Sequence, residues 1–107
     1  MVRIKRPKEV VRAKYCTPGG RCCAVGALAY GSGYKTKKWL RTLGGTKNIP
    51  FEYDLSEYLG VSYYMIANLR AKNDASHPGK LTPLEILEEF VDAQDNLEWE
   101  VENVHQA

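Results

Sequence analysis

The 107-residue sequence lacks any long apolar run, and no stretch approaches the ~18 apolar residues that would span a bilayer. Residues 1–7 are charged but have no apolar segment behind them, so they do not resemble a secretory signal. We therefore expect a protein without a membrane segment that works in the cytoplasm.

Cysteine is scarce, with only Cys16, Cys22 and Cys23. The number is odd, and adjacent Cys22 and Cys23 cannot easily bridge each other, which predicts reduced thiols in a cytoplasmic protein. These three cysteines and His77 could in principle surround zinc. Their spacing lacks the usual separation of two to four residues between ligands, so we predict no metal site. We also predict no cofactor.

Acidic residues are nearly absent from the first half of the chain, where Glu9 stands alone. Residues 1–50 hold twelve basic side chains, whereas residues 51–107 hold three basic and twelve acidic ones, so the halves carry +11 and −9. Such asymmetry is typical of a nucleic-acid footprint. It is equally compatible with two halves that neutralise each other on folding.

Length and apolar content predict one folded domain over residues 1–107, without internal repeats or a low-complexity linker. Apolar residues at helical spacing, separated by Gly and Pro, predict a compact, mostly α bundle of five to six short helices. The expected helices cover residues 7–15, 21–30, 36–43, 54–60, 62–72 and 82–94. We expect a loop at residues 48–50. Gly26, inside the most apolar helix, predicts the close approach of another element.

The two ends of the chain show a period of two instead. Val2 and Ile4 alternate with basic residues, and Leu97, Trp99 and Val101 alternate with acidic ones. We predict strands within residues 1–6 and 97–103 that form an antiparallel ribbon, because unlike charges would then face each other.

Residues 54–72 organise the rest, since a short helix, a turn at Gly60 and a second helix from Ser62 share one apolar seam. The stretch resembles helix–turn–helix DNA-binding proteins. That resemblance implies a recognition helix over residues 62–72, with phosphates held by the basic first half. The implied nucleic-acid-binding residues are Tyr63, Tyr64, Asn68, Arg70, Lys72, Arg12, Lys35 and Lys38. A plain helical hairpin is the alternative, since Glu52, Asp54 and Glu57 on the first helix would oppose DNA.

A second resemblance spans residues 22 to about 94. Cys22-Cys23-Ala24-Val25-Gly26-Ala27-Leu28, then Asn73-Asp74, then Thr82-Pro83-Leu84-Glu85 is similar to a family of small actinobacterial and actinophage proteins. The family implies an actinobacterial or phage source but supplies no activity. For a phage-encoded protein the expected cytoplasm would be that of the host. For Asn73 and Asp74 we expect a structural role at a helix end, in left-handed or Asx-turn geometry.

Two further hypotheses compete with DNA binding. Many Tyr and Trp side chains in a small domain are typical of protein interfaces, so a phage protein that modulates a host protein is the alternative, and a homodimer stays open. A thiol-dependent enzyme is third: Cys23 would open a helix, where a thiol pKa falls, with His77 and Asp74 as partners. Apolar surroundings would instead raise that pKa. We therefore predict a non-enzymatic nucleic-acid-binding protein.

Overall fold

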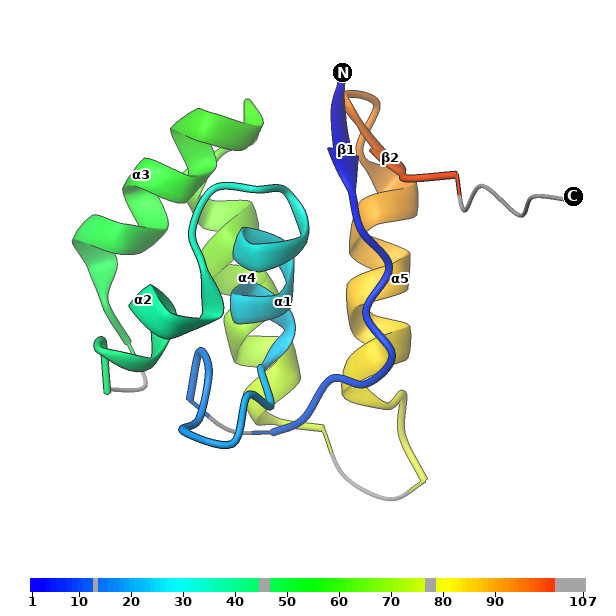
Figure 1. Cartoon of the computed structure of the whole chain (residues 1–107). Helices are drawn as coiled ribbons and strands as arrows, with labels where there is room; N and C mark the ends of the chain where they lie inside the picture. The colour runs from blue at the N-terminus through cyan, green and yellow to red at the C-terminus, as the bar shows by residue number, and fades with distance from the viewer. Residues whose placement is uncertain (13, 45–46, 77–78, 102–107) are drawn as a thin grey trace, which may run out of the picture.

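The computed structural model describes residues 1–12, 14–44, 47–76 and 79–101 of the chain. In these ranges the fold is mostly helical, as predicted, and none of its helices is long and apolar enough to cross a membrane. The elements in order are β1 (Val2–Ile4), α1 (Ala24–Gly31), α2 (Lys37–Arg41), α3 (Ile49–Leu59), α4 (Tyr63–Asp74), α5 (Pro83–Ala93) and β2 (Leu97–Trp99). Helices α2 and α3 lie on one side of α1 and α4, and α5 with both strands lies on the other (Figure 1).

Helix α1 forms the centre of the core, because every residue from Ala24 to Ala29 is buried. Its small side chains let neighbours approach closely. A Cβ atom on Gly26 would lie 1.9 Å from the backbone oxygen of Tyr15, so only glycine fits there. The predicted close approach at Gly26 is thus confirmed.

The predicted pair of helices around Gly60 is present as α3 and α4. Gly60 ends α3 in the left-handed conformation at φ 73°, and Ser62 caps α4 by accepting a hydrogen bond from the Met65 amide. However, α3 begins at Ile49, because Asn48 caps it and Pro50 fits its first turn. The loop expected at residues 48–50 is therefore wrong.

The turn between α3 and α4 is also held from the far end of the chain. The side-chain amide of Asn96 donates to the carbonyl of Leu59 at 2.6 Å and to that of Gly60 at 3.1 Å. These carbonyls have no partner within α3, so Asn96 completes the end of that helix.

The terminal strands exist, but they pair in parallel, with Val2 opposite Leu97 and Arg3 opposite Glu98. The antiparallel ribbon was a wrong prediction. Alternating side chains fix which face of a strand is buried, but they do not fix its direction. The expected pairing of unlike charges does occur, between Arg3 and Glu98 at 3.1 Å. Helix α5 begins with the predicted capping box of Thr82 and Glu85.

The segment expected as a helix over residues 7–15 is not helical among its described residues. Its backbone instead runs beside residue 22, and the chain then turns where the Thr17 carbonyl accepts from the Gly20 amide. This turn places Cys16 opposite Cys22, and the two form a disulfide. The prediction of reduced thiols is therefore wrong for this pair, while Cys23 is free and buried.

Candidate nucleic-acid interface

One stripe of α4 faces solvent. Tyr64 is 77 % exposed, and Asn68 and Lys72 are exposed at successive four-residue intervals, which places all three on one side of the helix. We call these three residues the outer face of α4. The opposite side carries buried Ile66, Leu69 and Asn73, so α4 packs through a different set of residues.

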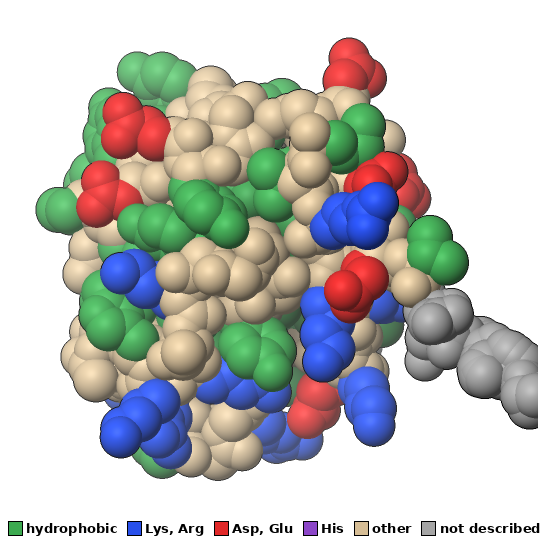
Figure 2. Space-filling view, turned by 45° about the horizontal axis from the view of Figure 1, so that its top comes forward, with side chains coloured by type: hydrophobic (Ala, Val, Ile, Leu, Met, Phe, Trp, Pro, Cys, Tyr) green, Lys and Arg blue, Asp and Glu red, His purple; other side chains and the backbone are tan. Residues whose placement is uncertain are grey.

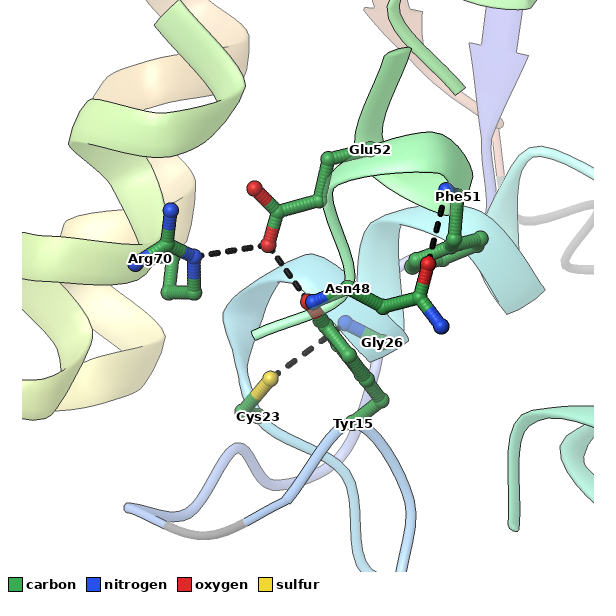
Figure 3. Close-up of polar contacts among 7 residues, drawn as sticks. All are labelled: Tyr15, Cys23, Gly26, Asn48, Phe51, Glu52 and Arg70. Atoms are coloured by element: carbon green, nitrogen blue, oxygen red, sulfur yellow. Dashed lines mark hydrogen bonds and ion pairs between the residues drawn. The ribbon is translucent and has the colours of Figure 1, made fainter. Parts of the chain in front are cut away.

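Arg70 does not belong to the outer face. Its Nε donates to Oε2 of Glu52 at 2.7 Å, with the Arg70 side chain only 14 % exposed and that of Glu52 fully buried. The hydroxyl of Tyr15 donates to the same oxygen at 2.5 Å (Figure 3). The resemblance implied that Arg70 is presented outward; the structure corrects this, because a buried carboxylate on α3 holds it inward.

Tyr15, Glu52 and Arg70 form a buried polar cluster. The hydrogen bond to Glu52 raises the pKa of Arg70, whereas burial, followed by the bond to Glu52, raises the pKa of Tyr15 well above its usual range. The other oxygen of Glu52, Oε1, has no hydrogen-bond partner in the part of the chain that the structure describes. Sequence reasoning placed Glu52 on the first helix of the pair but missed this role, because it treated Glu52 as an acid that would oppose DNA.

Asn73 is likewise turned inward. Its Oδ1 accepts from the amide of Ala24 at 2.8 Å, and its Nδ2 donates to the carbonyl of Val11 at 3.3 Å. Asn73 thereby satisfies one of the free amides at the start of α1. The expected left-handed or Asx-turn geometry at Asn73 and Asp74 is wrong, since α4 stays helical through Asp74 and only glycines have positive φ among the described residues.

The proposed thiol centre is not activated. Cys23 caps α1, and its Sγ accepts from the Gly26 amide at 3.5 Å. Burial raises the pKa of the Cys23 thiol to about 11, as expected for apolar surroundings, and this outweighs the lowering by the Gly26 amide at the helix start. Burial also raises the pKa of Asp74, at the far end of α4. His77 lies outside the described residues.

The disulfide removes two of the candidate zinc ligands. Cys16 and Cys22 form a disulfide and offer no thiolate. Over residues 1–12, 14–44, 47–76 and 79–101, no group of three or more His, Cys, Asp and Glu side chains could hold a metal ion.

Basic residues gather near the C-terminal end of α4. Three contacts bring residues 11–22 beside the ends of α2 and α4 and the start of α3: Asn73 to Val11, Arg41 to the Pro18 carbonyl, and the Asn48 amide to Tyr15. This region, which we call the basic pole, carries exposed Arg12, Lys14, Arg41, Lys47 and Lys72. In Figure 2, Lys and Arg gather low on the visible face, and most Asp and Glu lie higher.

Other basic residues of the first half lie elsewhere. Arg3 and Arg6 form ion pairs with Glu98 and Glu88, so the neutralisation hypothesis holds for these two. Lys35 lies over aromatic rings near α2, and Lys38 is exposed on α2. Lys38 lies on α2 three residues before Arg41 of the basic pole, whereas Lys35 precedes that helix.

The N-terminal end of α4 has a different character. Tyr63 is half-buried and stacks on Tyr53 of α3, with ring centroids 4.2 Å apart, and it also meets Tyr64 edge-on at 5.8 Å. Asp54 and Glu57 are exposed on the same α3. The exposed surface of α4 therefore runs from an aromatic and acidic end to a basic end.

No protein-family model matches the chain, and neither a curated protein nor a solved structure does. The two resemblances described above rest on the residues quoted for them. Function is therefore inferred from side chains and their geometry.

Proposed function

We propose that this protein binds nucleic acid, in the form of duplex DNA, through the outer face of α4 and the basic pole. The observation that carries this proposal is the exposure of Tyr64, Asn68 and Lys72 along the second helix of a glycine-turned pair. A helix presented in this way is the part of a helix–turn–helix motif that enters the major groove.

Each exposed residue has a chemical role in this proposal. The amide of Asn68 pairs with the N6 and N7 edge of adenine, and Tyr64 offers an aromatic ring for apolar contact with a thymine methyl group. Lys72, with Arg12 and Lys14 of the basic pole, neutralises phosphates. Arg70 has no role at the DNA, because Glu52 holds its guanidinium.

The charge layout also sets the direction of approach. Helix–turn–helix proteins commonly contact bases through the first residues of the recognition helix. Here Asp54 and Glu57 are exposed on α3 and would repel phosphates, whereas the basic pole lies at the C-terminal end of α4. We therefore propose that the DNA backbone runs over the C-terminal half of α4.

Fluorescence anisotropy with a labelled duplex, measured over a series of salt concentrations, tests the proposal. We expect steep weakening with salt, and Lys72→Ala should lower the magnitude of the salt slope by about 1. Asn68→Ala should weaken the best duplex by about 1–3 kcal/mol. Arg3→Ala, which removes an exposed charge beside Glu98, is the matched control. Absence of duplex binding at low salt would reject the proposal.

A protein partner is the second candidate function, and a specific observation favours it. Tyr53, Tyr64 and Met65 are 50 %, 77 % and 42 % exposed around half-buried Tyr63, which makes an aromatic surface of the kind found in interfaces. In this candidate a phage-type protein acts on a host protein. Tyr64→Ala would then abolish binding to a purified partner, and that binding would depend weakly on salt.

The cytoplasm remains our proposed location, and the disulfide makes it testable. Disulfides persist mainly in oxidising compartments. Thiol titration of protein denatured directly from cells should give three free thiols if Cys16 and Cys22 are kept reduced there. A single free thiol would contradict a reducing cytoplasm.

A further inference from the structure

A second surface, away from the outer face of α4, combines aromatic rings with ammonium groups. A groove of about 420 Å³ lies where α1 ends and α2 begins. It is lined by Tyr30, Gly33, Tyr34, Lys35, Thr36 and Trp39, and we call it the aromatic groove. The basic pole shares none of these residues.

Two rings of the groove, those of Trp39 and Tyr34, pack against the core. Buried Phe51 packs against Trp39, with centroids 5.6 Å apart, and against Tyr34 at 6.3 Å in a stacked arrangement. Thr36 fixes the backbone beneath by accepting from the Trp39 amide at 3.1 Å. Trp39 nevertheless stays 37 % exposed, and Tyr30 stays 39 % exposed. A ligand would therefore meet preorganised ring surfaces, which lowers the entropy lost on binding.

Lysine side chains lie over these rings. The Nζ atom of Lys35 is 4.4 Å from the ring centroid of Trp39 and 5.1 Å from that of Tyr34, and Nζ of Lys37 is 5.0 Å from that of Tyr30. The ammonium groups lie against these ring faces by cation–π attraction, so a base that stacks on such a face takes the place of the ammonium group. Rings and positive charges thus alternate across the groove.

Acidic side chains do not line the described part of the aromatic groove. Among the described residues, none of those that line the groove is acidic. Burial, and then Asp54 and Glu57 on α3, raise the pKa of Tyr34, so those carboxylates lie near that ring rather than near Lys37. A negatively charged ligand is therefore favoured over the side that carries Lys35, Lys37 and Trp39.

From this arrangement we infer that the aromatic groove binds single-stranded nucleic acid, with bases stacked on Trp39 and Tyr30 and flanking phosphates held by Lys35 and Lys37. A single strand carries a planar base and a negative charge on every nucleotide, which matches alternating rings and ammonium groups. Bases inside a duplex do not offer their faces, so this site is distinct from the proposed contact with duplex DNA. The groove assigns Lys35 a role different from the phosphate contact expected for duplex DNA.

Tryptophan fluorescence tests the groove directly. In a Trp99→Phe background Trp39 is the remaining tryptophan, so its emission reports on the groove alone. Titration with a 12-nucleotide thymidine oligonucleotide at low salt should quench this emission, and a uridine oligonucleotide of equal length tells whether DNA or RNA is the preferred strand. Unchanged emission with both oligonucleotides would overturn the inference.

Affinity measurements with labelled oligonucleotide supply the second arm. Tyr30→Ala, which leaves the contact between Trp39 and Phe51 in place, should weaken single-strand binding roughly tenfold. Arg3→Ala, which removes an exposed charge beside Glu98 and outside the groove, is the control and should retain affinity. Equal affinity of Tyr30→Ala and the unaltered protein would refute the site. Because duplex binding depends on Asn68 and Lys72, failure of either proposal can be recognised without the other.

Discussion

The two sides of α4 carry similar residue types, but the inner side makes hydrogen bonds within the protein and the outer face is exposed to solvent. The inner side has Arg70 and Asn73, which hydrogen-bond to Glu52, Ala24 and Val11. The outer face has Asn68 and Lys72, which are exposed. An arginine and an asparagine on a candidate recognition helix therefore indicate nucleic-acid contact only where no buried partner on another element holds them. Position around the helix, more than residue type, separates structure from recognition.

The largest effect should come from removing the carboxylate that holds the inner side. Glu52→Ala leaves Arg70 partly buried without its partner and removes the acceptor of Tyr15, so we expect a loss of about 3–5 kcal/mol in the free energy of unfolding. Urea denaturation measures this. Tyr64→Ala, on the outer face, should change stability by no more than about 0.5 kcal/mol.

An exposed ion pair sharpens the same contrast. Arg3 and Glu98 are 75 % and 44 % exposed, so Glu98→Ala should reduce stability by about 0–1 kcal/mol. Equal losses for Glu52→Ala and Glu98→Ala would contradict the view that burial decides the importance of these pairs.

Alkaline pH should loosen the core beneath the inner side of α4. The pKa of Cys23 is about 11 in the folded protein, against an ordinary value of 9.0. Since the folded state holds this proton more tightly, the associated stability is complete below pH 9 and is lost as pH rises to 11. The loss should reach about 1.4 kcal/mol per pH unit. The raised pKa of Tyr15, whose ordinary value is 10.0, adds a loss of the same sign that begins near pH 10.

Urea denaturation between pH 8 and pH 11 measures this slope. Cys23→Ser keeps a helix-capping side chain at the start of α1 but removes the thiol, so its stability should fall less steeply from pH 9. An identical slope in Cys23→Ser would mean that Cys23 is not the titrating group.

At Asn73 we expect a loss of stability smaller than that for Glu52→Ala. Asn73→Ala removes an acceptor from the Ala24 amide and a donor from the Val11 carbonyl, and we expect a loss of about 1–3 kcal/mol in urea denaturation. Asn68→Ala makes the same chemical change on the outer face and serves as the control, with an effect within about 0.5 kcal/mol. Equal stability of both variants would remove the distinction between the two sides.

The sequence predicted those features that depend on neighbouring residues. Gly60, Ser62 and the Thr82–Glu85 capping box act within one turn of a helix, so their patterns located the structure correctly. The strand direction and the Cys16–Cys22 disulfide depend on how the chain folds back, which residue types alone do not determine. For the candidate site, adjacent Tyr63 and Tyr64 could not both point inward, but the sequence did not show that Tyr64 is the exposed one. The inward turn of Arg70 did not, because its partner lies eighteen residues away on another helix.

Asn96 connects the C-terminal part of the chain to the turn between α3 and α4. By donating to Leu59 and Gly60, its amide makes the angle between α3 and α4 depend on a residue that comes after α5. A fragment reduced to α3 and α4 would keep both helices and the apolar contact between them, but it would lose the hydrogen bonds from Asn96. The pair of α3 and α4 is therefore not a transplantable module, and grafting it elsewhere would require an equivalent amide at the turn between them.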